Sequence, residues 1–207
     1  MINKKLSGDG REVFLFGANH SKELNQINEI ESSINPFNPE IVLIEGGFDK
    51  ANFNSKEEAI KLGQEMGFTS FLCKEKGISM KSNDPSDSEE IKFLEENYKT
   101  EVVNLYFLLR DFSTKRTTKL PQNIDSLMKE VLNEKFHLSK DYGDYFNPTL
   151  SINLFNEVTR KLDFFRDSYL RDLLKGLLKK HKRIFIIKGD YHLESDLDKL
   201  QNLVQNG

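Results

Sequence analysis

Short apolar runs alternate with longer amphipathic segments along this chain. Continuous apolar runs rich in β-branched and aromatic residues occupy positions 13–16, 41–44 and 184–187, and the last predicted strand extends to Lys188. Such runs are typical of strands that are buried on both faces of a sheet. A weaker run within 77–85 predicts a further short strand that leads into a turn at Asp84-Pro85.

Apolar residues at steps of three and four predict the helices. The segments with this spacing are 21–34, 55–75 (where Gly67 marks a potential break), 87–113, 123–136, 151–182 and a C-terminal segment that ends near 204. In the longest segment one buried stripe is expected, formed by Leu154, Val158, Leu162, Phe165, Tyr169, Leu173 and Leu177.

This order of elements favours an α/β fold with a mainly parallel or mixed central sheet flanked by helices. The length of 207 residues suits a single domain, 1–207. The section from about 86 to 160 has helical patterns only and is interpreted as a helical insertion or cap within that domain.

Charge and cysteine content narrow the possible function classes. Lys and Arg number 30 and Asp and Glu number 33, which gives a formal net charge of −3. This balance argues against binding to nucleic acid or to an anionic membrane surface. No apolar run approaches the roughly 20 residues of a membrane-spanning helix. No signal peptide is visible, and a single cysteine excludes an intrachain disulfide framework, so we expect a cytoplasmic protein. A homo-oligomer is compatible with the sequence.

Three polar side chains follow directly on apolar strands. His20 and His192 each lie three residues beyond a glycine that ends such a run, Gly17 and Gly189, and Glu45 follows the strand 41–44. Because the carboxyl ends of parallel strands meet at one edge of a sheet, these side chains are expected to face one crevice. The glycines provide either a positive φ or close backbone approach at the strand ends.

Two imidazoles and a carboxylate fit two kinds of chemistry. His20, Glu45 and His192 can bind a divalent metal ion that activates water. Without a metal, one histidine can act as general base while the carboxylate orients it or assists. Asp190, inside the second turn, can hold a histidine tautomer or serve as a further ligand.

Three further residues have both a structural and a functional interpretation. Glu65 is interpreted either as a helix-surface acid or as part of the site. Asp84 is interpreted first as a turn residue before Pro85, with a role in the site as the alternative. Arg166 either pairs with Asp163 or Glu157 on its own helix or binds an oxyanion or a substrate carboxylate.

The remaining candidates favour ordinary structural roles. His137 and His181 are expected at the surface, and Cys73 is expected in the core as an inert thiol. The loop 139–149, which carries Tyr142, Tyr145 and Phe146, is either a lid or a packing element.

Together these motifs resemble the TraB/Tiki superfamily, which includes erythromycin-esterase-like and ChaN-like proteins. The matching stretches, in chain order, are Gly17-Ala18-Asn19-His20, Glu45 in "IVLIEGG", Glu65 and Asp84 in "GQEMGFTSFLCKEKGISMKSNDP", Arg166-Asp167, and Gly189-Asp190-Tyr191-His192. The first motif lacks the Thr that often follows its Gly, and the section 86–150 matches no family feature.

The resemblance implies an α/β fold with a split sheet, a site built from both Gly-x-x-His turns, and hydrolysis. Tiki-type members are metal-dependent peptidases, which implies Mn, Co or Zn. Erythromycin esterases use a histidine base on an ester, and ChaN-like members bind haem. Asn19, Glu65, Asp84 and Asp190 would be supporting or substrate-binding residues.

The leading hypothesis is therefore a hydrolase of small-molecule or peptide substrates. His20, Glu45 and His192 would be its metal ligands or catalytic groups, and Arg166 would stabilise developing negative charge. The alternative is a non-catalytic protein of the same fold that binds haem, a metal or a small ligand. A structural partner protein is a third possibility.

Overall fold

A computed structural model describes residues 2–20, 24–113, 121–132 and 153–206. The chain divides into two compact units, one formed by Met1–Ser86 and Arg166–Gly207, the other by Asp87–Phe165. His137 and the loop 139–149 lie outside the described residues. Among the helices within the described ranges, none is long and apolar enough to cross a membrane.

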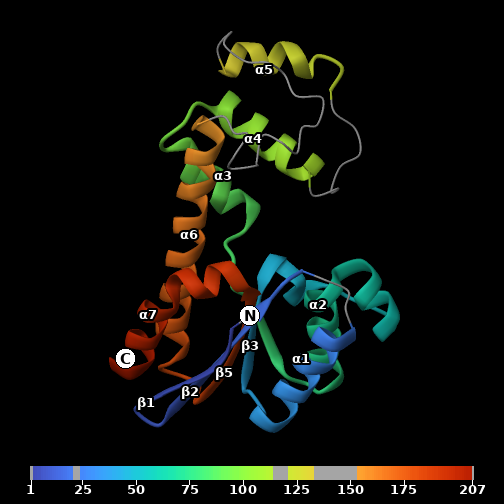
Figure 1. Cartoon of the computed structure of the whole chain (residues 1–207), viewed down its shortest axis with the longest axis vertical. Helices are drawn as coiled ribbons and strands as arrows, with labels where there is room; N and C mark the ends of the chain where they lie inside the picture. The colour runs from blue at the N-terminus through green and yellow to red at the C-terminus, as the bar shows by residue number, and fades with distance from the viewer. Residues whose placement is uncertain (1, 21–23, 114–120, 133–152, 207) are drawn as a thin grey trace. The chain divides into compact units, whose positions relative to one another are not determined.

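The first unit contains a five-stranded mixed sheet with the strand order β1-β2-β5-β3-β4 (Figure 1). The strands are β1 (Asn3–Gly8), β2 (Arg11–Ala18), β3 (Ile41–Ile44), β4 (Ser79–Ser82) and β5 (Arg183–Gly189). Only β1 is antiparallel, to β2, and the other pairings are parallel. The predicted α/β fold with a mainly parallel or mixed sheet is confirmed.

Strand β1 was not predicted. Its sequence, "NKKLSG", is mostly polar, and of its residues only Leu6 is buried. An edge strand that exposes most of its side chains lacks the apolar run by which the inner strands are recognised.

Helices cover both faces of this sheet (Figure 1). They are α1 (Leu24–Phe37) and α2 (Lys56–Glu75) on one face, and the later part of α6 (Asn153–Leu177) with α7 (Asp190–Asn206) on the other. Successive residues of β5 serve opposite faces: Ile184 and Ile186 pack with α6 and α7, whereas Phe185 and Ile187 pack with α1 and α2. Burial on both faces explains why the inner strands are continuously apolar.

The second unit is helical and has its own core. It contains α3 (Asp87–Glu95), α4 (Thr100–Ser113), α5 (Ile124–Leu132) and the first part of α6. The helix predicted over 87–113 is therefore two helices. Tertiary contacts hold the break between them: the Tyr98 hydroxyl donates to Glu157, and Lys161 donates to the Asn97 side chain.

Helix α6 contributes to two cores, so the single predicted stripe is only partly correct. Val158 and Leu162 are buried in the second unit, together with Phe155. Further along, the sheet of the first unit packs against Leu170 and Leu174, while the predicted Leu173 is only partly buried. The apolar face shifts along the helix because its two halves pack on different neighbours.

Candidate functional site

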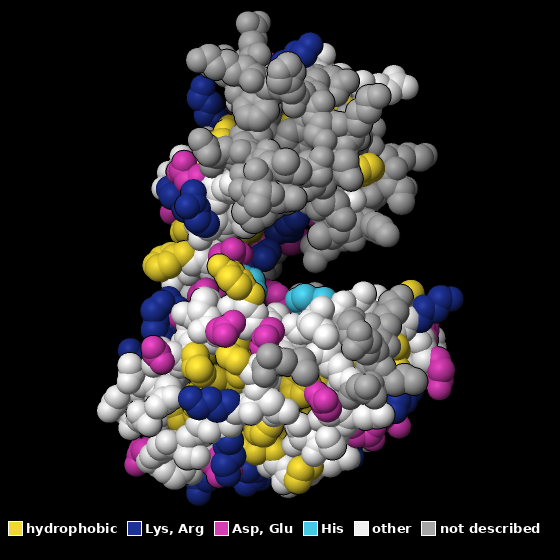
Figure 2. All heavy atoms as spheres, viewed as in Figure 1, with side chains coloured by type: hydrophobic (Ala, Val, Ile, Leu, Met, Phe, Trp, Pro, Cys, Tyr) yellow, Lys and Arg dark blue, Asp and Glu magenta, His cyan; other side chains and the backbone are white. Residues whose placement is uncertain are grey.

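His20 lies just beyond the carboxyl end of β2, in a turn with φ of 55°. Its Nδ1 is 2.8 Å from Oε1 of Glu65. Because a carboxylate only accepts, Nδ1 carries the proton and donates a hydrogen bond to Glu65. The side chain is 53% exposed, and Figure 2 shows histidine side chains at the molecular surface. The ring of His20 is thus held through Nδ1, and the rest of its side chain is open to solvent.

Glu65 is fully buried, so its interpretation as a plain surface acid is wrong. Helix α2 is interrupted directly before it, at Gln64, where φ is 52°, and not at Gly67 as predicted. Glycines flank this kink: a side chain at Gly63 would strike the Phe48 ring, and one at Gly67 would strike the Ala59 carbonyl. The sequence "GQEMG" thus permits a tight kink whose glutamate turns inward to His20.

Glu45 occupies the sharp turn after β3. The next two residues, Gly46 and Gly47, have φ values of 76° and 72°, which glycine adopts without steric cost. Oε2 of Glu45 accepts a hydrogen bond of 2.6 Å from the backbone N–H of Gly189, and it lies 3.8 Å from Nε2 of His20. The carboxylate therefore connects the end of β3 with both Gly-x-x-His turns.

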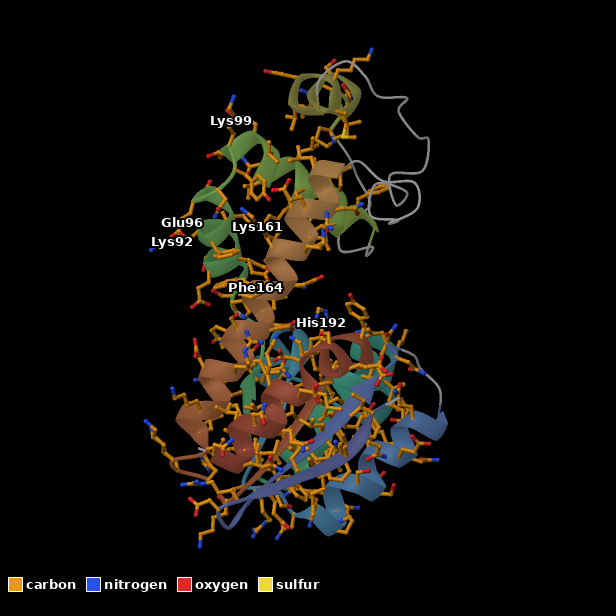
Figure 3. All side chains as sticks on the ribbon, turned by 60° about the vertical axis from the view of Figure 1, so that its left-hand side comes forward. Lys92, Glu96, Lys99, Lys161, Phe164 and His192 are labelled. Carbon is orange, nitrogen blue, oxygen red and sulfur yellow. The ribbon has the colours of Figure 1, made fainter. Side chains whose placement is uncertain are left out.

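His192 lies in the first turn of α7, because this helix begins at Asp190, directly after β5 (Figure 3). Its Nδ1 is 3.3 Å from Oδ1 of Asp167 on α6. Both side chains are only 16% exposed, so the pair is well shielded from water. A second imidazole thus lies beside a carboxylate, at a longer distance than that between His20 and Glu65.

The two imidazoles and Glu45 converge at Gly189. A Cβ atom placed on this glycine would lie 3.1 Å from Nε2 of His20, 3.6 Å from Oε2 of Glu45 and 3.6 Å from Cδ2 of His192. The absence of a side chain at Gly189 is what allows these groups to meet. The structure brings together the three residues that the strand-end pattern singled out.

The two Gly-x-x-His turns are not equivalent. Neither Gly17 nor Gly189 has a positive φ, and each is needed for close approach instead. A side chain at Gly17 would strike the carboxylate of Asp190, whose Oδ1 accepts a hydrogen bond from the backbone N–H of Ile2. Asp190 therefore anchors the start of the chain to this turn. Asn19 is exposed.

Asp84 pairs with a lysine that sequence reasoning missed. Oδ1 of Asp84 lies 2.6 Å from Nζ of Lys188, which is 1% exposed, and Oδ2 accepts from the N–H of Gly46. Burial by itself would raise the pKa of Asp84, but the positive charges of Lys188 and Arg166 outweigh it and the pKa is lowered. Arg166 thus acts on Asp84. A lysine inside the apolar run "IFIIKG" was the available signal.

The pKa of His20 is raised above its ordinary value of 6.5. The largest cause is the hydrogen bond to Glu65, partial burial opposes it, and the negative charges of Glu45, Glu65 and Asp84 add to it. The imidazolium form is therefore favoured by three surrounding carboxylates.

The three predicted metal ligands have other contacts in this arrangement. Within the described residues, no group of three or more His, Cys, Asp or Glu side chains is placed to hold one. His192 presents a carbon edge to Gly189 while its Nδ1 lies beside Asp167, and Oε2 of Glu45 accepts from the Gly189 N–H.

The other sequence candidates lie away from this cluster. His181 pairs with Glu40, which directly precedes β3, at a distance of 3.5 Å. Cys73 is buried, and burial raises the pKa of its thiol to about 12, which agrees with an inert core thiol.

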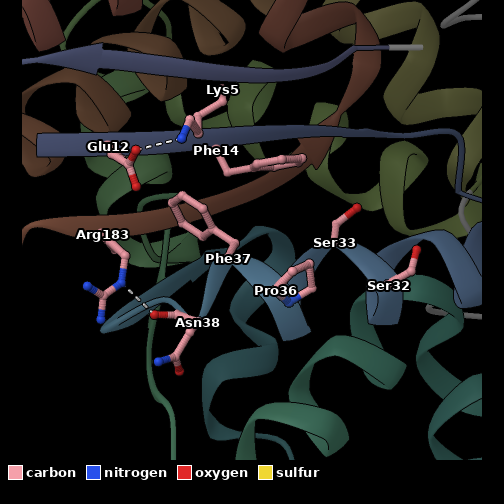
Figure 4. Close-up of a pocket in the computed structure, with 9 residues that line it drawn as sticks. All are labelled: Lys5, Glu12, Phe14, Ser32, Ser33, Pro36, Phe37, Asn38 and Arg183. Carbon is pink, nitrogen blue, oxygen red and sulfur yellow. Dashed lines mark hydrogen bonds and ion pairs between the residues drawn. The ribbon is translucent and has the colours of Figure 1, made fainter.

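A shallow depression of about 630 Å³ lies near the amino ends of β2 and β5 (Figure 4). Its charged groups already have partners: Lys5 pairs with Glu12 at 2.6 Å, and Arg183 donates to the Asn38 carbonyl at 2.8 Å. The depression therefore offers no free reactive group comparable to the cluster around Gly189.

Comparison of the chain with protein-family models, with curated proteins and with solved structures finds no match.

Proposed function

We propose that this protein is a hydrolase that uses His20 as its general base on an ester or peptide bond. One observation carries the proposal: Glu65 holds the proton-bearing Nδ1 of His20 at 2.8 Å, while Nε2 faces the cluster at Gly189. A buried carboxylate that orients an imidazole and stabilises its charged form is a recurring device in hydrolysis. The resemblance to the TraB/Tiki superfamily supports the same reaction class.

In the proposed reaction, Nε2 of His20 accepts a proton from a water molecule as its oxygen attacks the carbonyl carbon. Glu65 and Glu45 stabilise the resulting imidazolium. The bond to the leaving group breaks, and the proton passes from Nε2 to that group. Ester or amide plus water thus become acid plus alcohol or amine. Arg166 provides positive charge for the developing oxyanion, and His192 borders the space in front of Nε2 of His20.

The test is hydrolysis of panels of acyl esters and peptides by the purified protein. His20→Ala is expected to reduce kcat/KM by about 10²- to 10⁴-fold, the usual contribution of a general base. Glu45→Ala and His192→Ala are also expected to lose activity. His181→Ala is the matched control, because this histidine also pairs with a glutamate but lies away from the cluster. Full activity in a folded His20→Ala variant would overturn the proposal.

A further inference from the structure

The two residues after β4 tie the carboxyl ends of β3 and β5 together. The backbone N–H of Asn83 donates to the carbonyl of Ile44, the last residue of β3, at 3.0 Å. Its side-chain Nδ2 donates to the carbonyl of Ile187 in β5 at 2.9 Å. Asn83 is fully buried, so these bonds are shielded from competing water. One residue thus bonds to the backbone of two neighbouring strands near their carboxyl ends.

Asp84 repeats this connection one residue further on. Its Oδ2 accepts from the N–H of Gly46 at 3.1 Å, and its Oδ1 pairs with Nζ of Lys188 at 2.6 Å. The side chains of Asp84 and Lys188 are 12% and 1% exposed. The ion pair therefore links the turn after β3 with the end of β5.

These contacts surround the Glu45–Gly189 hydrogen bond on both sides. Asn83 and Asp84 hold the residue before and the residue after Glu45. The same two residues bind Ile187 and Lys188, the two positions directly before Gly189. Asn83, Asp84 and Lys188 therefore join the segment around Glu45 to the segment before Gly189. The distance from the Glu45 carboxylate to the Gly189 N–H depends on how these two segments are held.

A buried ion pair contributes little net free energy to folding, because the cost of desolvating both charges offsets their attraction. An apolar pair would fill the same space at lower cost, so the Asp84–Lys188 pair calls for a different reason. We propose that Asn83, Asp84 and Lys188 are positioning residues that set the Glu45 carboxylate against the Gly189 N–H. The catalytic meaning of this role rests on the proposed function of Glu45; the geometric role does not.

The experiment reads the backbone amide of Gly189 by ¹H–¹⁵N NMR in the full chain, without any substrate. A short bond to a carboxylate moves an amide proton downfield, and Glu45→Gln provides the reference for its loss. Asp84→Asn and Lys188→Met are each expected to move the Gly189 resonance toward that reference. Its hydrogen exchange should accelerate about tenfold or more, as for a lost hydrogen bond to a charged group. The double variant lacks the same link, so its Gly189 resonance should also move toward the reference.

Arg171→Met is the matched control. It breaks the Arg171–Asp196 pair between α6 and α7, whose carboxylate is 2% exposed, and it should leave the Gly189 resonance in place. If Lys188→Met does not fold, the Gly189 amide is measured in Asp84→Asn and Asn83→Ala instead. A wild-type Gly189 shift and exchange rate in these folded variants would overturn the inference. A protein with the expected amide shifts but no turnover would overturn the hydrolase proposal alone.

Discussion

Oε1 of Glu65 lies 2.8 Å from Nδ1 of His20, although 45 positions separate the two residues. The contact decides which nitrogen of His20 carries the proton and leaves Nε2 directed at Glu45 and Gly189. A half-exposed turn histidine has no such orientation by itself. The pair thus fixes the orientation of a half-exposed imidazole and the position of its proton.

Replacement of Glu65 by glutamine should lower the pKa of His20 toward its ordinary value. The hydrogen bond to Glu65 is the main cause of the raised pKa, and an amide provides no negative charge to stabilise the imidazolium. NMR titration of the His20 ring measures the change. Glu75→Gln, at an exposed position on the same helix, should leave the titration unaltered. An unchanged His20 pKa in Glu65→Gln would contradict the assigned pairing.

The pH dependence of stability has a defined sign. Because the folded pKa of His20 is raised above 6.5, its contribution is fully present below the unfolded pKa and is lost as pH rises through the folded pKa. The free energy of unfolding of the wild type, minus that of His20→Gln, should therefore fall over that pH range. Urea denaturation at a series of pH values measures this difference. A difference that grows with pH would show that the native state does not favour the imidazolium.

Replacing the two motif glycines, Gly17 and Gly189, by alanine should have different effects on stability and activity. Gly17→Ala is expected to destabilise the fold by about 1–3 kcal/mol, because the new methyl group strikes Asp190 and displaces its bond to Ile2. Gly189→Ala is expected to cost less stability, since the flexible ring of His20 can move by a few tenths of an ångström. It should nevertheless reduce hydrolysis, because the methyl group enters the reacting space. Thermal unfolding and kcat/KM distinguish the two effects, and equal effects of both variants on both quantities would refute the distinction.

The Asp84–Lys188 pair should show strong coupling in a double-mutant cycle. Asp84→Asn or Lys188→Met leaves one buried charge without its partner, at a cost of about 3–5 kcal/mol each. The double variant should cost much less than the sum of the two. Chemical denaturation of the four proteins measures the coupling. Additive effects would mean that the two side chains do not act as a pair.

Hydrolytic activity should survive treatment with a chelator. The mechanism derived from His20 and Glu65 needs no metal, so EDTA dialysis followed by assay should give unchanged kcat/KM. Metal analysis of the untagged protein completes the measurement. Activity that is lost on chelation and restored by Mn, Co or Zn would overturn the metal-free mechanism.

The local pattern was sufficient for the inner strands and for the grouping of three polar side chains at their carboxyl ends. Strands buried on both faces are mostly apolar, so 13–16, 41–44 and 184–188 were recognisable without any partner. Parallel strands end at one edge, which is why His20, Glu45 and His192 could be grouped before the fold was known. The polar edge strand β1 and the break between α3 and α4 carry no comparable local signal, because tertiary contacts hold them.

The partners of the site residues could not be derived in this way. Glu65 reaches His20 across 45 positions, Lys188 reaches Asp84 across 104, and Gly189 reaches Glu45 across 144. A residue's own neighbours in the chain carry the information for strand ends and turns, because those depend on local burial and backbone freedom. Which carboxylate orients which imidazole depends on how helices pack on the sheet, and this is decided only when the chain is folded.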